Sequence, residues 1–128
     1  MTHTIAVPEH LKPYLMPVFD RKAMSVTALQ VSSLTSYTDV LVIVEAASHR
    51  QATSIAQHIT KTLKASGITA IGTEGIKEGE WALLDYGDIV IHIFETRARA
   101  FYDLEGFWAD APAYDLSGIN AGRTGEPS

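Results

Sequence analysis

The chain has no cysteine, and this absence excludes disulfide bonds, cysteine-ligated zinc, iron–sulfur clusters and catalysis by a thiol. It also has no uncharged apolar run that approaches the roughly 18 residues of a membrane-spanning helix. Residues 1–19 lack the basic start and long apolar core of a signal peptide, because Glu9, His10 and Lys12 interrupt them. From these absences we expect a soluble, cytoplasmic protein.

Positive charge is scarce as well. The 128 residues contain ten Lys and Arg against fifteen Asp and Glu, which gives a formal net charge of −5. The basic residues are scattered along the sequence, whereas clustered cations are needed to hold the phosphate backbone of a nucleic acid. We therefore expect little direct nucleic-acid binding. A basic protein partner fits this charge better.

The sequence offers little to hold a metal or a cofactor. Its five histidines show no H-x-H or H-E-x-x-H spacing, and no acidic cluster has the spacing of a calcium loop. Gly72, Gly75 and Gly79 occur close together, but they match neither G-x-x-x-x-G-K-[ST] nor G-x-G-x-x-G. No serine stands in a G-x-S-x-G elbow. We expect no cofactor, no metal and no catalytic residues.

A few polar residues near one predicted turn could still carry chemistry. Asp85 and Asp88 flank Gly87, and His92 follows in the next strand; two carboxylates and an imidazole can serve acid–base chemistry or bind a metal. Aspartate at such turns commonly bonds to nearby backbone amides, so we interpret Asp85, Gly87 and Asp88 as a structural turn. Alternation along the strand puts His92 on the same face as Phe94, which predicts a hydrogen-bonded histidine in a covered sheet.

Periodicity and turn residues predict the order of helices and strands. Ser48 and Gln51 form a capping box, and an apolar face then continues to Gly67, which predicts a helix from His49. We expect a kinked helix at residues 9–22, because prolines interrupt its amphipathic pattern. Strands are expected at residues 24–31, 39–45, 68–72, 80–84 and 88–94, with short helical segments at 97–102 and 104–108.

These elements predict a single α/β domain with a mixed sheet of about five strands flanked by helices. The strand at 39–45 is rich in β-branched residues and should be covered on both faces. With the following helix and the strand at 68–72 it makes a right-handed crossover, and the last two strands form an antiparallel hairpin. We expect the domain to span residues 9–112, between flexible ends at 1–8 and 113–128.

The segment from Glu74 to Trp108 is rich in aromatic and charged side chains, the residue types that dominate binding energy at protein interfaces. Strand alternation puts Trp81 and Leu83 on one face, so Trp81 serves either the core or a partner. Phe94 and Phe101 are expected in the core. We predict an interaction surface whose partner-binding residues are Trp81, Tyr86, Arg97, Tyr102, Glu105 and Trp108.

The same segment resembles that of a known family. It carries, in order, EG, W, LLDYGD, H-x-F, R, FYDLE and W, and it is similar to the ribosomal silencing factors (RsfS), the bacterial relatives of Iojap. Upstream, TD and S-x-RQ resemble the family stretch TDYFVIATGTSNRQ. The departures from that stretch are Val40, Glu45, Ala46 and His49.

The resemblance implies a nucleotidyltransferase-like fold without the catalytic motif, and fold likeness by itself gives no activity. It implies a protein that is not an enzyme and that binds the large ribosomal subunit through ribosomal protein uL14. By occupying that face, such a protein sterically blocks association with the small subunit. Translation is then repressed when nutrients are scarce, and a role in large-subunit biogenesis is also implied.

Two other hypotheses stay open. The fold could support a metal-dependent nucleotidyl or phosphoryl transferase that uses Asp39, Asp85 and Asp88. Alternatively, an exposed aromatic patch could close on a second copy of the chain and give a homodimer off the ribosome.

Overall fold

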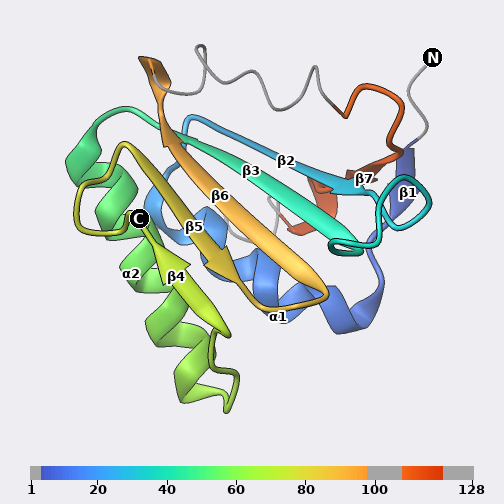
Figure 1. Cartoon of the computed structure of the whole chain (residues 1–128), viewed down its shortest axis with the longest axis horizontal. Helices are drawn as coiled ribbons and strands as arrows, with labels where there is room; N and C mark the ends of the chain where they lie inside the picture. The colour runs from blue at the N-terminus through green and yellow to red at the C-terminus, as the bar shows by residue number, and fades with distance from the viewer. Residues whose placement is uncertain (1–3, 98–107, 120–128) are drawn as a thin grey trace.

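A mixed β-sheet organises the chain, as a computed structural model of residues 4–97 and 108–119 shows (Figure 1). Within these residues the strands are β1 (Thr4–Ala6), β2 (Ser25–Gln30), β3 (Val40–Ala46), β4 (Gly72–Glu74), β5 (Trp81–Asp85), β6 (Ile89–Glu95) and β7 (Ala113–Asp115). Their order across the sheet is β1-β7-β2-β3-β6-β5-β4. The predicted α/β class and mixed sheet are confirmed, with seven strands in the described residues instead of about five.

The central strand is β3, whose side chains are apolar on both faces. Residues 40–44 are all buried, as the β-branched run predicts. β3 pairs antiparallel with β2 and parallel with β6, so both of its edges have backbone partners. The predicted central position is confirmed.

The predicted hairpin joins β5 and β6, which pair antiparallel from Trp81 opposite Phe94 to Asp85 opposite Val90. Gly87 has a φ of 88°, the left-handed conformation that this tight turn requires.

The long helix α2 (His49–Ala65) begins where the capping residues predict. The Ser48 hydroxyl accepts a hydrogen bond from the Gln51 backbone N–H at 3.1 Å, and the Gln51 side chain accepts one from the Ala47 backbone N–H at 2.6 Å. Both bonds satisfy amides at the helix entrance. The face that α2 buries consists of Ala52, Ile55, Ala56, Ile59 and Leu63.

The N-terminal helical region is broken, as its prolines predict. It consists of η1 (Glu9–Leu11), α1 (Lys12–Leu15) and η2 (Met16–Arg21). Pro13 and Pro17 each lie in the first turn of a segment, where a missing backbone donor costs least.

The strand expected at residues 68–72 is misplaced. The observed strand β4 begins at Gly72, because the backbone N–H groups of Gly67 and Ile68 bond to carbonyls in the last turn of α2. β4 pairs antiparallel with β5 at the sheet edge. It is therefore parallel to β3 but separated from it by β6 and β5, so the crossover passes over two strands.

The two ends of the described chain add strands that the sequence does not predict. β1 pairs in parallel with β7, and Ala113 of β7 pairs with Leu29 of β2. Tyr114 is buried, and Ile5 packs against the core. We expected flexible ends at 1–8 and 113–128, and this expectation is wrong for β1 and β7. The sequence did not reveal them, because strands of three residues are too short to show a periodic pattern.

The two faces of the sheet are covered differently. The helices pack on one face, and α2 lies behind β4 and β5 in Figure 1. The opposite face carries a smaller buried cluster of Leu29, Val31, Leu41, Ile43, Phe94 and Ala111. In the described part of the chain, no helix has both the length and the apolar character to cross a membrane.

Candidate functional site

The face of the sheet opposite the helices brings together Trp81 and Leu83 from β5 with His92 and Phe94 from β6. In the antiparallel register Trp81 lies opposite Phe94, and Leu83 lies opposite His92. Residues directly opposite in such a pair point to the same side, so these four side chains form one patch. We call this patch the aromatic face.

Trp81 anchors the aromatic face. Its indole N–H donates a hydrogen bond to His92 Nδ1 at 2.9 Å, and its ring centroid lies 4.9 Å from that of Phe94. The Phe94 side chain is fully buried, as predicted, while Trp81 and Leu83 are only partly buried. Trp81 thus has a buried, hydrogen-bonded side and a side that reaches the surface. This combination is typical of aromatic residues at interfaces.

His92 stays neutral at pH 7 in this setting. Burial lowers the pKa of His92 to about 4, because the charged imidazolium would lose its hydration. An indole nitrogen is only a donor, so His92 Nδ1 must be the acceptor and the ring proton resides on Nε2. The predicted hydrogen-bonded histidine in a covered sheet is confirmed.

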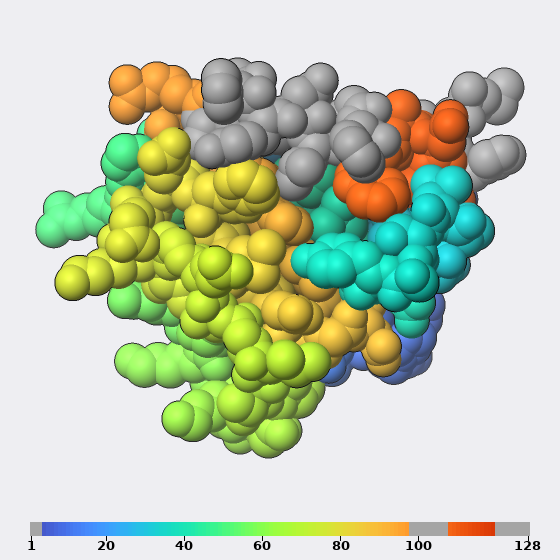
Figure 2. All heavy atoms as spheres, viewed as in Figure 1, coloured from blue at the N-terminus to red at the C-terminus, as the bar shows by residue number. Residues whose placement is uncertain are grey.

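One end of the aromatic face carries an acidic rim with an exposed tyrosine. Asp85 follows Leu83 on the same side of β5, and Glu74 of β4 lies opposite Leu83. Tyr37 is exposed, yet its pKa is raised by partial burial and then by the charges of Asp85 and Glu74. In Figure 2 the loop that contains Tyr37 (residues 32–39, cyan) stands beside the strands β4 to β6. Negative charge therefore borders the apolar patch at this end.

The other end of β6 holds a charged junction around Glu95. This carboxylate is buried and accepts hydrogen bonds from the Arg97 backbone N–H at 3.1 Å and from Arg97 Nε at 3.4 Å. These contacts and His49 Nε2, at 3.5 Å, favour the charged form of Glu95. Its pKa is lowered, mainly by the Arg97 backbone hydrogen bond. The Arg97 side chain is 86% exposed, so it is available to a partner.

The turn between β5 and β6 has a structural role. Asp85 Oδ1 accepts a hydrogen bond from the Gly87 backbone N–H at 2.8 Å, as predicted. The Asp88 backbone carbonyl accepts from the Asp39 and Val40 amides, and this links the turn to the start of β3. Within residues 4–97 and 108–119, no three acidic, histidine or cysteine side chains are grouped to hold a metal ion.

The remaining predicted partner-binding residues are placed unevenly. Trp108 is partly buried and packs with Trp81 against the same cluster. Tyr86 lies apart from them: its ring packs edge-on against Tyr14 at 5.5 Å, beside the helix-covered core. Its hydroxyl is buried without a hydrogen-bond partner among the described residues, and burial raises the pKa of Tyr86 to about 12. Tyr102, Glu105, Phe101 and the expected helices at 97–102 and 104–108 fall wholly or largely outside the described residues.

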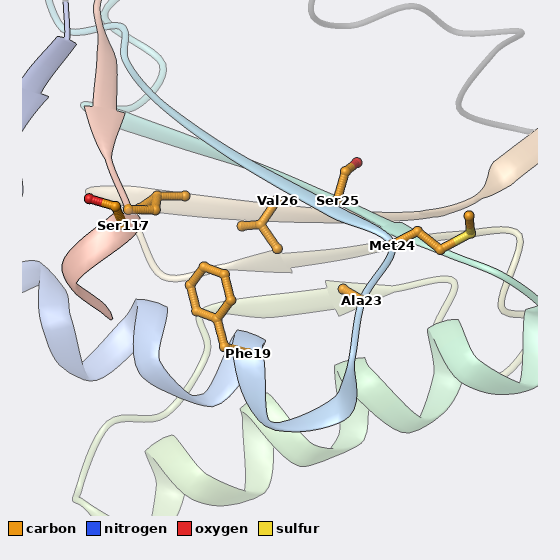
Figure 3. A pocket seen from close by; sticks show the side chains of 7 residues that line it. Phe19, Ala23, Met24, Ser25, Val26 and Ser117 are labelled. Atoms are coloured by element: carbon orange, nitrogen blue, oxygen red, sulfur yellow. The ribbon is translucent and has the colours of Figure 1, made fainter. Parts of the chain in front are cut away.

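A pocket lies away from the aromatic face, between η2, the start of β2 and the residues after β7 (Figure 3). It has a volume of about 220 Å³, and Phe19 points from η2 toward Val26 on β2. Among the described residues that line the pocket, Ser25 and Ser117 have the only polar side chains, and no side chain is charged. This lining offers no group for acid–base or metal chemistry.

The sequence-based list missed Leu83, Tyr37, Glu74 and the pairing role of His92. Alternation in β5 already placed Leu83 beside Trp81, so that signal was available. Tyr37 and Glu74 reach the aromatic face only because the loop before β3 and the edge strand β4 fold beside it. No local pattern marks such a placement.

The geometry defines a class: a mixed α/β domain with a partly exposed aromatic face and an acidic rim, suited to binding a macromolecule. Comparison with known proteins makes this specific. Residues 4–128 match the family described as "Ribosomal silencing factor during starvation". The "Ribosomal silencing factor RsfS" of Halalkalibacterium halodurans is 36% identical over 102 residues, which cover 80% of this chain and 87% of that protein. That of Bacillus subtilis is 35% identical over 102 residues, 79% of this chain and 86% of that protein.

A plant relative and two solved structures agree with this match. "Protein Iojap, chloroplastic" of Zea mays is 33% identical over 95 residues, covering 74% of this chain and 41% of that protein. A crystal structure from Chromobacterium violaceum has a TM-score of 0.74 at 30% identity and covers 80% of this chain and 88% of its own. A crystal structure from Bacillus halodurans has a TM-score of 0.74 at 33% identity and covers 84% of this chain and 98% of its own. The chain belongs to the ribosomal silencing factor family.

Proposed function

We propose that this protein silences translation by docking on the large ribosomal subunit and blocking the approach of the small subunit. The docking partner is ribosomal protein uL14, and the aromatic face provides the contact. The protein acts as a steric obstacle and catalyses no reaction. The observation that carries the proposal is Trp81, which is fixed by His92 and Phe94 on its buried side and reaches the surface on the other.

The composition of the aromatic face supports a protein partner. Tryptophan is the residue type most enriched among those that dominate binding energy, and a surrounding rim that excludes water strengthens its effect. Leu83 extends the apolar area, while Glu74 and Asp85 supply negative charge at its edge. A basic surface on the partner would be attracted to this rim and its association accelerated.

The contact that we propose extends beyond the aromatic face. A standard interface buries about 600 to 1,000 Å² on each partner. The aromatic face and its acidic rim lie on the neighbouring strands β4 to β6, and the exposed Arg97 follows just after the end of β6. We expect all three to contribute to the contact. A protein docked on the subunit-joining surface blocks joining by its volume alone and needs no conformational change. Binding is therefore sufficient for silencing.

Subunit joining tests the proposal directly. Purified large and small subunits are mixed with the protein, and sucrose-gradient sedimentation measures the fraction of joined ribosomes. We expect wild type to lower that fraction and to migrate with free large subunits, whereas Trp81→Ala does so only at much higher concentration. Met24→Ala removes an exposed apolar side chain at the start of β2 and is the matched control. Unchanged joining at saturating wild-type protein would rule out the mechanism.

The partner is tested separately by capture of purified uL14. We expect wild type and Met24→Ala to retain uL14 and Trp81→Ala to lose it. Capture of whole large subunits without capture of isolated uL14 would keep the silencing role but assign docking to another component.

The absence of catalysis is also testable. A ligand bound by the native state raises its melting temperature. We expect nucleoside triphosphates with Mg²⁺ to leave the melting temperature unchanged; a clear rise followed by nucleotide turnover would favour the transferase hypothesis.

A further inference from the structure

The helix α2 differs in charge from the rest of this acidic protein. It carries Arg50, Lys61 and Lys64 and contains no Asp or Glu between His49 and Ala65. All three basic side chains are exposed. Since charges beyond about 10 Å are largely screened at physiological salt, a partner near α2 responds to this local charge more than to the net charge of −5.

The three cations of α2 lie on one line. Lys61 and Lys64 follow Arg50 by close to three and four full helical turns, so all three point to the same side. Ser54 and Gln57, also exposed, occupy the same line between them. We call these five residues the α2 stripe. From Arg50 to Lys64 it extends about 21 Å along the helix axis.

The loop between β4 and β5 adds a fourth cation beside the α2 stripe. The Thr53 hydroxyl donates a hydrogen bond to the Ile76 carbonyl at 2.6 Å and holds the loop against the helix. Gly79 lies so close to the His49 carbonyl that a Cβ atom could not fit between them. As a result, Lys77 stands at the first half of α2, although it is far from Arg50 in the sequence.

On the other side of α2, η2 adds a fifth cation. An Arg21 Nη atom lies 3.2 Å from His58 Nδ1, and the Gln51 side chain donates to the Arg21 carbonyl at 3.2 Å. Asp20, which is hydrogen-bonded to His58 Nε2 at 2.8 Å, adds one negative charge beside Arg21. Lys22 follows with another positive charge, and its carbonyl accepts from the Gln51 side chain at 3.1 Å. The fold thus gathers at α2 six of the ten Lys and Arg of the chain.

A shallow pocket of about 310 Å³ lies between the α2 stripe and the loop. Its lining consists of the cations Arg50 and Lys77, the acid Glu78, and His49, Thr53, Ser54 and Gln57. One acidic group against two cations leaves the pocket positive. It can therefore accept an anionic group from a partner that lies along the stripe.

From this arrangement we propose that the α2 stripe, with Lys77 and Arg21, binds the phosphate backbone of RNA. Lys and Arg contact phosphates through charge, while Ser and Gln side chains donate hydrogen bonds to phosphate oxygens. A straight row of cations with donors between them matches a rod-like polyanion better than an isolated acidic group. The stripe lacks the aromatic side chains that stack on unpaired bases, so we expect it to contact the backbone of a duplex. α2 lies on the side of the sheet opposite the aromatic face, which leaves both surfaces available at once (Figure 1).

Binding of a short RNA duplex by the full-length protein tests this proposal without any ribosomal protein. Fluorescence anisotropy across a salt series gives the affinity and its salt dependence. We expect wild type to bind and Lys61→Glu/Lys64→Glu to lose about ten-fold or more in affinity at low salt. The salt slope should fall by about 0.9 for each lost phosphate contact, the value for duplex DNA.

Matched variants separate the α2 stripe from a general charge effect. Lys12→Glu reverses a single charge outside α2, where Lys12 pairs with Glu9, and should bind nearly as wild type; Lys61→Glu alone should bind clearly less. Lys61→Gln/Lys64→Gln removes the charges without reversing them and should give an intermediate loss. These side chains are exposed, so circular dichroism should show folded protein throughout. No RNA binding by wild type, equal losses in Lys12→Glu and Lys61→Glu, or binding of polyglutamate in place of RNA would each overturn the proposal.

Discussion

The indole nitrogen of Trp81 donates a hydrogen bond to Nδ1 of His92, 2.9 Å away, across two antiparallel strands. This bond fixes the plane of the indole and the tautomer of the imidazole together. A side chain held in this way loses little conformational freedom when a partner covers it, which favours tight binding. The pair therefore links the packing of the sheet to the proposed docking contact.

Replacing Trp81 should affect docking more than folding, because the side chain is only partly buried. We expect Trp81→Ala to weaken binding to the large subunit by about 2 kcal/mol or more, roughly thirty-fold in affinity. Trp81→Phe keeps the contact with Phe94 but loses the hydrogen bond, so its affinity should lie between those of wild type and Trp81→Ala. Binding to fluorescently labelled subunits measures both. Wild-type affinity for Trp81→Ala would remove the aromatic face from the mechanism.

The buried neutral His92 should make stability depend on pH. Its pKa is about 4 in the folded state and near 6.5 when unfolded, so the unfolded chain takes up a proton first as the pH falls. The contribution of neutral His92 to the free energy of unfolding is fully present above pH 6.5. It decreases between pH 6.5 and 4 and is lost below pH 4. The total loss should be about 3 kcal/mol. Urea unfolding at several pH values measures it.

His92→Gln is the matched variant for that experiment, because its amide oxygen can accept from Trp81 but does not titrate in this range. Its stability should decrease less than that of wild type between pH 6.5 and 4. Parallel curves for the two proteins would show that His92 is not the group responsible.

The cap of α2 should contribute measurably to stability. Ser48→Ala removes the acceptor for the Gln51 amide and should destabilise the fold by about 1 kcal/mol. Ser54→Ala changes an exposed serine inside the same helix, where alanine is the better helix former, and should be neutral or slightly stabilising. Urea unfolding of the two variants compares the positions. Equal effects would contradict the capping role.

Gly79, in the loop between β4 and β5, should be far less replaceable than Gly72 at the start of β4. It has a φ of 73°, and a Cβ atom there would collide with the His49 carbonyl, so Gly79→Ala should cost about 2 kcal/mol or more. Gly72 has no atom within 4 Å of an added Cβ and no positive φ, so Gly72→Ala should change stability little. Thermal unfolding compares the two. A small effect at Gly79 would mean that the loop can move away from α2.

Local patterns predicted the elements whose residues interact with near neighbours in sequence. The cap and apolar face of α2, the β-branched run of β3 and the Gly87 turn were each visible in the sequence. The broken N-terminal helix was also visible, because proline acts on its own turn. The family resemblance followed from the same kind of local information, carried mainly by the segment from Glu74 to Trp108.

Residues that depend on distant partners were not predictable in this way. Three-residue strands such as β1 and β7 exist only because they pair with each other. Tyr86, a candidate for the surface, packs against Tyr14 from a distant helix. The position of β4 at the sheet edge depends on how far α2 continues before the chain turns back.

The sequence by itself determined the class of fold, the hairpin with Trp81 and His92, and the acidic net charge, because periodicity, turn residues and composition are local or additive properties. Only the tertiary structure decided which face Trp81 occupies, that His92 accepts its hydrogen bond, and that scattered cations meet along α2. These features depend on strand register and on helix and loop packing. Such contacts join residues that the sequence keeps far apart, and no local pattern encodes them.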